Sequence, residues 1–250
     1  MTWRLADTVR GVVTAGVAGI FVAVFVAASN ASSVTGLGVG EFPTYAQVFT
    51  VNPWTAAARA NRGLAGDRRE RQTFKNLTEF EVGQIEISFD VTGGSSAGSA
   101  NDTGIAVRIF EVDDVNAATW TAGNLVKELI FPDTLPGSTD GLLFTLTGAD
   151  VFSLPARFAG TTGYGLEIST PNSLTTDGNP GVWYFTNDTN VADPYPDGSY
   201  YRDAGGAAGN READRRDLGL ALLVPEPSSV CLAVLGLWGL VGLWRRRRSR

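Results

Sequence analysis

The chain has 250 residues, of which 44% are hydrophobic and 18% are charged, so it has room for one core-bearing domain of ordinary size. It has no histidine and a single cysteine, Cys231, which excludes Ser-His-Asp and Cys-His catalysis and a disulfide within the domain. Of its 26 acidic residues only Asp7 and Glu226 lie outside residues 32–224, whereas seven of its 20 basic residues do, so this central part carries a net charge of about −11. That charge argues against binding to nucleic acid or to anionic lipid.

Residues 1–31 have the pattern of a secretory signal peptide. Two arginines precede an apolar run at residues 11–28, and Ser29 and Ala31 supply the small residues that signal peptidase requires before a cut near Ala31. Because the apolar run is long for such a segment, an uncleaved N-terminal anchor is the alternative. Either form predicts that residues 32–224 are exported by the general secretion machinery.

The middle of the chain has the pattern of β-strands throughout. In IEISFDV, residues 85–91, apolar and polar side chains alternate with the period of a half-buried strand, and Gly83 with Gln84 marks a bulge or the entrance to it. Further strands are predicted in GIAVRIFEV, NLVKELIF, GLLFTLT, GYGLEIS, GVWYFTN and DLGLALL. Polar clusters between these segments predict turns, and no amphipathic helix stands out. Residues 32–224 are therefore predicted to form an all-β domain, an antiparallel, jelly-roll-like sandwich.

Two arginine-rich segments flank or interrupt these strands. They are GDRRERQ at residues 66–72 and NREADRRD at residues 210–217. Mixed charges of this kind are typical of a solvated surface in which the charges neutralise one another, so both segments are predicted to be exposed.

A set of aromatic residues is the first candidate binding site. Flat rings with polar edges suit the C–H faces of sugars, so a stacking platform for glycans is one interpretation. Trp183 and Phe185 share one strand face while Tyr184 lies on the other, so packing in the core is the alternative for at least one set. The candidate glycan-binding residues are Trp183, Tyr200 and Tyr201, with Tyr184 and Tyr195 beside them in the sequence.

Acidic loops are the second candidate, because carboxylates are ligands for calcium. The two groups are Glu111, Asp113 and Asp114, and Asp188, Asp193 and Asp197. Neither has the spacing of a known calcium loop, and aspartate is also common in turns. No metal site and no cofactor is therefore predicted.

The C-terminal segment has three parts in a fixed order. Pro225, Glu226 and Pro227 come first, and the two prolines predict an extended, exposed backbone at Glu226. About residues 228–244 then form an uncharged apolar run, near the lower limit for a membrane-spanning helix. The basic end at residues 245–250 is placed in the cytoplasm by the positive-inside rule. Its arginines are Arg245, Arg246, Arg247, Arg248 and Arg250.

This order of motif, apolar helix and basic end resembles the PEP-CTERM sorting signal of bacterial exported proteins, which is also known as the C-terminal domain of ice-binding proteins. The resemblance implies recognition by exosortase, a membrane-embedded cysteine transpeptidase that cuts near the motif. It further implies a single-pass precursor in the inner membrane, with a cytoplasmic C-terminus, that later reaches the cell surface or the extracellular matrix. A permanent single-pass anchor is the alternative.

A second resemblance lies in the middle of the chain. The segments RQTFKN, LPARFAGTTGYGLEIS, GSYYRDAGG and DLGLALL are similar to the jelly-roll ectodomains found in PEP-CTERM proteins, some of which resemble carbohydrate-binding modules. This similarity suggests a fold and leaves the activity open.

The function predicted from these features is that of a non-enzymatic surface or matrix protein. Its expected partners are exosortase, signal peptidase and the membrane, with no nucleic acid. The alternative is a carbohydrate-binding module that attaches to exopolysaccharide or another glycan. An enzyme is not expected, because histidine, a metal-ligand cluster and a glycine-rich phosphate loop are all missing from the sequence.

Overall fold

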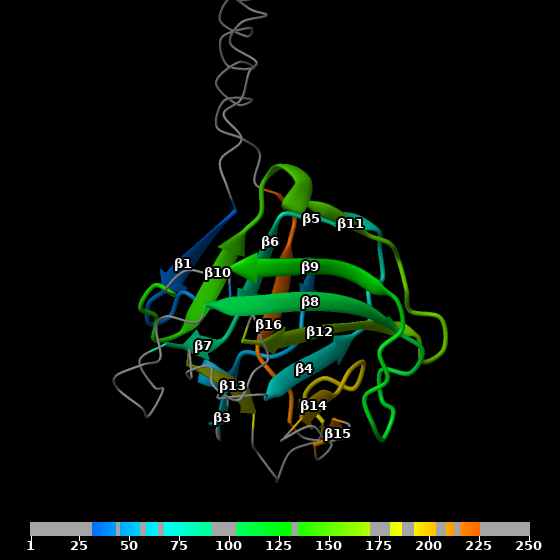
Figure 1. The fold of residues 1–250 in the computed structure, drawn as a ribbon. Coiled ribbons are helices and arrows are strands. Elements are labelled where there is room, and N and C mark those ends of the chain that lie inside the picture. Colours follow the sequence, from blue (N-terminus) through cyan, green and yellow to red (C-terminus); the bar gives the residue numbers. More distant parts are fainter. Residues whose placement is uncertain are drawn as a thin grey trace, which may run out of the picture. The chain divides into compact units, whose positions relative to one another are not determined.

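The structure is a computed structural model, drawn in Figure 1. The chain has two compact units, residues 1–31 and residues 32–250. All residues that the structure describes lie in the second unit. The predicted signal peptide, Glu226, Pro227, the apolar run and the basic end lie outside the described residues. The structure describes residues 32–43, 46–55, 59–64, 68–91, 104–131, 135–170, 181–186, 193–203, 209–212 and 216–225.

Two large antiparallel sheets make up most of the described fold. The five-stranded sheet has, in spatial order, β1 (Ser33–Leu37), β10 (Gly141–Thr145), β6 (Gln84–Ile87), β16 (Leu220–Leu223) and β2 (Val48–Phe49). The six-stranded sheet has β15 (Asn210–Arg211), β14 (Tyr200–Asp203), β4 (Arg69–Phe74), β12 (Gly163–Ser169), β8 (Ile105–Val112) and β9 (Leu125–Phe131). In Figure 1 the strands of the second sheet run across those of the first.

Two small sheets and two short helical turns complete the described elements. The three-stranded sheet contains β3 (Arg59–Gly63), β13 (Val182–Thr186) and β7 (Phe89–Asp90). The two-stranded sheet contains β11 (Phe152–Leu154) and β5 (Phe80–Val82). The 3-10 turns are η1 (Pro53–Thr55) and η3 (Gly148–Asp150). The prediction of an all-β fold is confirmed for the described part of the chain.

One hydrophobic core joins the two large sheets. Ile85, Leu142 and Leu220 of the five-stranded sheet belong to the same buried cluster as Val107 and Leu166 of the six-stranded sheet. The alternation read in the sequence supplies these residues, because every second side chain of a strand points to the same face. Burial of such apolar surface is the main favourable contribution to folding, at roughly 25 cal/mol per Å².

Two segments that are predicted to expose polar side chains, IEISFDV and GDRRERQ, bury some of them. Glu86 and Ser88, expected on the solvent side of the IEISFDV strand, are 0% exposed. The interpretation of GDRRERQ as solvated surface is wrong for Glu70, Arg71 and Gln72, which are buried in β4. The physical reason is that β4 lies between β14 and β12, where Tyr200 of β14 pairs with Glu70 and Glu167 of β12 pairs with Arg71. The side chain of Gln72 pairs with Asp217 instead.

Both ends of the described domain lie at the same end of the five-stranded sheet. Ser33 of β1 pairs with Thr145 of β10, Thr145 pairs with Gln84 of β6, and Gln84 pairs with Leu223 of β16. These four residues form one row across the sheet. The chain therefore enters β1 and leaves β16 on the same side of the domain.

No helix within the described ranges is long and apolar enough to cross a membrane. The predicted signal peptide at residues 1–31 and the predicted membrane helix at about residues 228–244 lie outside those ranges. Both therefore stay predictions.

Candidate functional site

The predicted sorting motif begins directly at the end of the domain. Only Val224 separates Leu223, the last residue of β16, from Pro225. The backbone N–H of Gly83 donates a 3.0 Å hydrogen bond to the carbonyl of Leu223, and a Cβ built on Gly83 would lie 2.3 Å from the Cα of Pro225. Gly83 thus lets the first proline of the motif pack against the sheet.

The three aromatic residues predicted as a glycan platform are buried. Trp183 is 0% exposed, and Tyr200 and Tyr201 are each 1% exposed. The indole N–H of Trp183 donates to the carbonyl of Gly219 at 2.9 Å, and the Tyr200 hydroxyl donates to Oε2 of Glu70 at 2.6 Å. Burial raises the pKa of Tyr201 to about 12. This placement favours the core interpretation, because none of the three rings presents a face to solvent.

Tyr184, on the other face of β13, instead lies beside an open groove of about 580 Å³. Its ring centroid is 4.5 Å from that of Trp54, a residue of η1, and the two ring planes are inclined at 52°. Both side chains are half-buried. The groove is also lined by Phe42, Asn52, Asp90 and Asp140, among others. The described residues therefore form an aromatic corner in a groove whose lining includes two aspartates.

Hydrogen bonds fix the side chains of this groove. The Trp54 indole N–H donates to the carbonyl of Asp140 at 2.7 Å, and its backbone N–H donates to Oδ1 of Asn52 at 3.0 Å. The Tyr184 hydroxyl donates to Oδ2 of Asp90 at 3.2 Å. The two rings are thus held in place before any ligand arrives.

Sequence reasoning did not single out Trp54. A signal was present in VNPWT, since asparagine before proline is typical of a turn, and a tryptophan in a turn is not covered by the alternation of a strand. The alternation of the strand does place Tyr184 on the face opposite Trp183. What the sequence could not supply was the contact between them, because residues 54 and 184 come together only in the folded chain.

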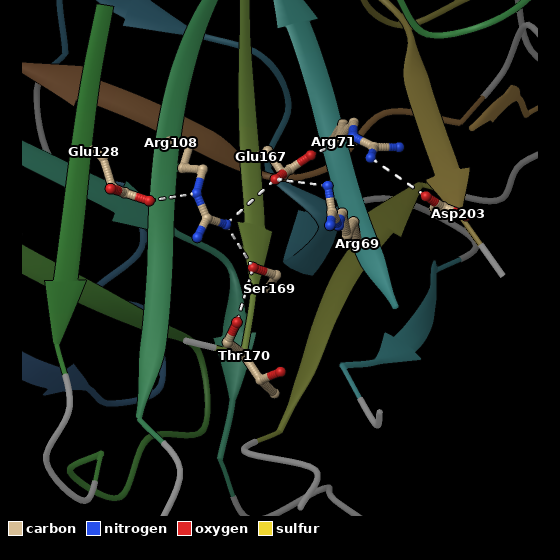
Figure 2. A network of polar contacts seen from close by, with 8 residues as sticks. All are labelled: Arg69, Arg71, Arg108, Glu128, Glu167, Ser169, Thr170 and Asp203. Atoms are coloured by element: carbon tan, nitrogen blue, oxygen red, sulfur yellow. Dashed lines mark hydrogen bonds and ion pairs between the residues drawn. The ribbon is translucent and has the colours of Figure 1, made fainter. Parts of the chain in front are cut away.

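A buried network of charges crosses the outer face of the six-stranded sheet (Figure 2). Oε2 of Glu167 accepts a 2.7 Å hydrogen bond from Nε of Arg71, and Oε1 lies 3.4 Å from Nη1 of Arg108. Arg71 also contacts Asp203 at 3.4 Å, and Arg108 contacts Glu128 at 2.7 Å. Acid and base alternate along the row, which suits a structural role.

Trp120 packs over part of this network. The guanidinium of Arg71 lies 5.2 Å from the centroid of the Trp120 ring, and a Cβ on Gly165 would lie 2.2 Å from that ring. Gly165 lies on β12, between β4 and β8. A glycine is required at this position, because any side chain would displace Trp120. The ring shields the ion pairs beneath it from water, which strengthens them.

Three acidic residues of the predicted loops contact basic residues, whereas Asp114 and Asp193 accept hydrogen bonds from the backbone N–H groups of Asn116 and Tyr195. Arg157 lies 3.0 Å from Asp113 and 4.0 Å from Glu111. Lys75 lies 3.0 Å from Asp197, while Asp188 is outside the described residues. Within the described part of the chain, no group of three or more acidic, cysteine or histidine residues is arranged to hold a metal ion.

Asp217 is a buried carboxyl group, so the prediction that NREADRRD is solvated surface is wrong for this residue. It is 1% exposed, and its Oδ1 accepts a 2.9 Å hydrogen bond from the side-chain amide of Gln72. Burial, and to a lesser degree the nearby Asp193, raises the pKa of Asp217 to about 8, although the bond from Gln72 acts in the opposite direction. This group is therefore largely protonated at neutral pH.

The comparisons with known proteins concern the C-terminal segment. The family model described as the PEP-CTERM protein-sorting motif matches residues 223–248, and thus begins at the last residue of β16. A search of curated proteins finds no match. The matched residues include the proline-glutamate-proline motif, the apolar run and four of the five terminal arginines. Residues 223–248 are therefore a PEP-CTERM protein-sorting motif, which supports placing the chain among the exported proteins that exosortase processes.

Proposed function

We propose that the chain is a non-catalytic protein of the cell surface or the extracellular matrix, which exosortase processes and delivers. The observation that carries this proposal is the sorting motif joined directly to a folded all-β domain. Signal peptidase removes residues 1–31, about residues 228–244 span the inner membrane once, and residues 245–250 stay in the cytoplasm until processing.

The ends of the domain support this arrangement. Ser33 and Leu223 lie in one row at the same end of the five-stranded sheet. During export, before residues 1–31 are removed, a domain whose two ends lie on one side can face the membrane with that side and leave its other surfaces in the periplasm. We further propose a jelly-roll-like sandwich, which is supported by two antiparallel sheets that share one core.

The lack of catalysis is supported by how the ionisable side chains are used. Glu167, Arg71 and Asp203 pair with one another, and Arg157 pairs with Asp113 and Glu111. None of these ion-paired groups lines the groove of about 580 Å³, and the two aspartates that do line it, Asp90 and Asp140, already accept hydrogen bonds from Tyr184 and from the backbone of Gly40.

Mass determination tests the proposed processing. The full-length chain is expressed in cells with and without an exosortase, and the surface form is recovered. We expect a C-terminus close to Pro225-Glu226-Pro227 only in the cells that possess the enzyme. A surface form that keeps its complete tail in both strains would identify a permanent anchor instead.

Glycan binding is the second candidate function. The observation that favours it is the groove in which Trp54 and Tyr184 form a fixed aromatic corner. A glycan array probed with the purified protein tests this function as a class. Binding to exopolysaccharide from the same cells would support it, and an array without any signal would contradict it.

A further inference from the structure

We infer that the groove between Trp54 and Tyr184 binds an uncharged, hydroxyl-rich saccharide ring. Its apolar C–H face packs against the two aromatic rings, and its hydroxyl groups donate hydrogen bonds to Asp90 and Asp140. This inference rests on the glycan-binding candidate above and adds to it the site and the chemical class of the ligand.

The aromatic corner supplies the apolar part of the recognition. The rings of Trp54 and Tyr184 are inclined at 52° with centroids 4.5 Å apart, and both are half-buried at the wall of the groove. Their polar atoms are already engaged, since the indole N–H donates to Asp140 and the Tyr184 hydroxyl donates to Asp90. A ligand can therefore contact the carbon atoms of the two rings, and such a surface suits the C–H face of a sugar.

The same hydrogen bonds lower the entropic cost of binding. Trp54 is held at its backbone N–H by Asn52 and at its indole by the carbonyl of Asp140. A site whose side chains are fixed before binding loses less conformational freedom when the ligand arrives. This pre-organisation distinguishes the corner from Phe158, which is 48% exposed and whose ring has no polar atom that a hydrogen bond could hold.

The carboxylates define the polar part. The carboxylate oxygens of Asp90 and Asp140 accept hydrogen bonds, and the hydroxyl groups of a sugar are natural donors to them. The Asp140 carboxylate is 4% exposed and accepts from the backbone N–H of Gly40, while Asp90 accepts from Tyr184. A carboxylate has about four acceptor positions, so it can accept hydrogen bonds from the hydroxyl groups of a ligand in addition to those from the protein.

Charge excludes acidic sugars. The described residues that line the groove include two aspartates and neither lysine nor arginine. An anionic ring such as a uronic acid or a sulfated sugar would be repelled by these carboxylates and by the net negative charge of residues 32–224. An uncharged ring avoids this cost.

The size of the groove fits a small part of a polysaccharide. Its volume of about 580 Å³ lies within the range of about 300–1,000 Å³ that is typical of ligand sites. An organic cation would also be attracted by carboxylates next to aromatic rings. Its affinity would depend on electrostatic attraction and fall with added salt, whereas the affinity of a neutral sugar would not. Salt dependence therefore separates the two ligands.

The test uses the full chain, purified in a detergent without a sugar headgroup. The probes are neutral gluco-, manno- and galacto-oligosaccharides, matched uronic-acid oligosaccharides and tetramethylammonium, and binding is measured by calorimetry at low and high salt. We expect at least one neutral oligosaccharide to bind with an affinity that changes little with salt. Trp54→Ala and Tyr184→Ala each weaken this binding by about tenfold or more. Phe158→Ala, which removes an exposed ring outside the groove, leaves it unchanged.

Thermal melting of each variant separates loss of the site from loss of the fold. If Trp54→Ala does not fold, Tyr184→Ala and the conservative Trp54→Phe carry the test. Neutral-glycan binding that survives both substitutions in the groove places glycan recognition elsewhere and overturns the inference while the glycan-binding function stands. Salt-sensitive binding of tetramethylammonium alone, or binding of uronic acids alone, overturns it as well. An absence of any glycan binding refutes both the site and the second candidate function, and leaves the sorting of the protein unaffected.

Discussion

Nε of Arg71 donates a 2.7 Å hydrogen bond to Oε2 of Glu167, and the two residues stand directly opposite each other on β4 and β12. Their side chains are only 4% and 3% exposed. Two opposite charges are thus buried on a sheet face that alternation alone would assign to solvent. Each depends on the other, because an unpaired charge at this depth would lose its hydration without compensation.

Replacing Glu167 with glutamine should therefore destabilise the domain strongly. The substitution keeps the shape of the side chain but leaves Arg71 and Arg108 without their shared counter-charge. We expect the free energy of unfolding to fall by about 3–5 kcal/mol in chemical denaturation. The matched control is Glu128→Gln, which removes the more exposed partner of Arg108 and should cost about 0–1 kcal/mol. Equal effects of the two substitutions would show that the burial of Glu167 has no energetic importance.

The raised pKa of Asp217 predicts a dependence of stability on pH. In the folded chain this pKa is about 8, against an ordinary value of 3.8, so the native state binds a proton that the unfolded state has already released. The contribution of this group to stability is thus fully present below about pH 3.8 and is lost as the pH rises through about 8. Asp217→Asn stays uncharged and should lack this loss. Unfolding measured between these pH values in both proteins checks it, and parallel curves would contradict the assignment.

The strands that the sequence predicts well are those whose apolar side chains alternate. GIAVRIFEV, GYGLEIS and NLVKELIF correspond to β8, β12 and β9. Their inner faces fill the common core, so the pattern and the burial have the same cause. The all-β class could be predicted for this reason, and the tail motif could be predicted because its parts follow one another in the sequence.

Other features depend on contacts between distant residues. The segment RERQTF has no alternation of apolar residues, and it becomes β4 because Glu167, Asp203 and Tyr200 supply partners for its charges. The groove likewise joins residues 54 and 184. Aromatic residues alone were an unreliable guide to it, since most large rings of a β domain are buried in the core.

Gly83 should not tolerate a side chain. A Cβ at this position would lie 2.3 Å from the Cα of Pro225, and relief would require the end of β16 to move. We expect Gly83→Ala to lower the free energy of unfolding by about 1–3 kcal/mol, as is typical of overpacking. Gly137→Ala is the control, because nothing lies within 4 Å of its Cβ position. Hydrogen exchange at Leu223 and Val224 should rise in the Gly83 variant alone, and unchanged exchange would show that Pro225 does not pack there.

The terminal arginines should control orientation without affecting the domain. Positive charges next to an apolar segment are retained in the cytoplasm, so Arg245 to Arg248 hold the proposed helix in one orientation. Replacing these four with glutamine should reduce the amount of processed surface protein, as measured by protease accessibility and surface labelling. The melting temperature of the domain should stay the same. Full processing of the variant would show that orientation is set by the N-terminal segment alone.

The last prediction concerns the motif itself. Replacing Pro225, Glu226 and Pro227 with alanine should leave a full-length protein that retains Cys231 and all five terminal arginines, because the proposed recognition segment is lost while the apolar run is intact. Since Pro225 packs against Gly83, this triple variant can also disturb the end of β16. Glu226→Ala alone separates the two effects, because it keeps both prolines, on which the predicted extended backbone depends. We expect the intact mass of Glu226→Ala, recovered from cells with an exosortase, to match the unprocessed chain and its melting temperature to match that of the wild type. A normally shortened product from both variants would mean that the enzyme reads a different part of residues 223–248, and that the proline-glutamate-proline segment is only a spacer between the domain and the membrane.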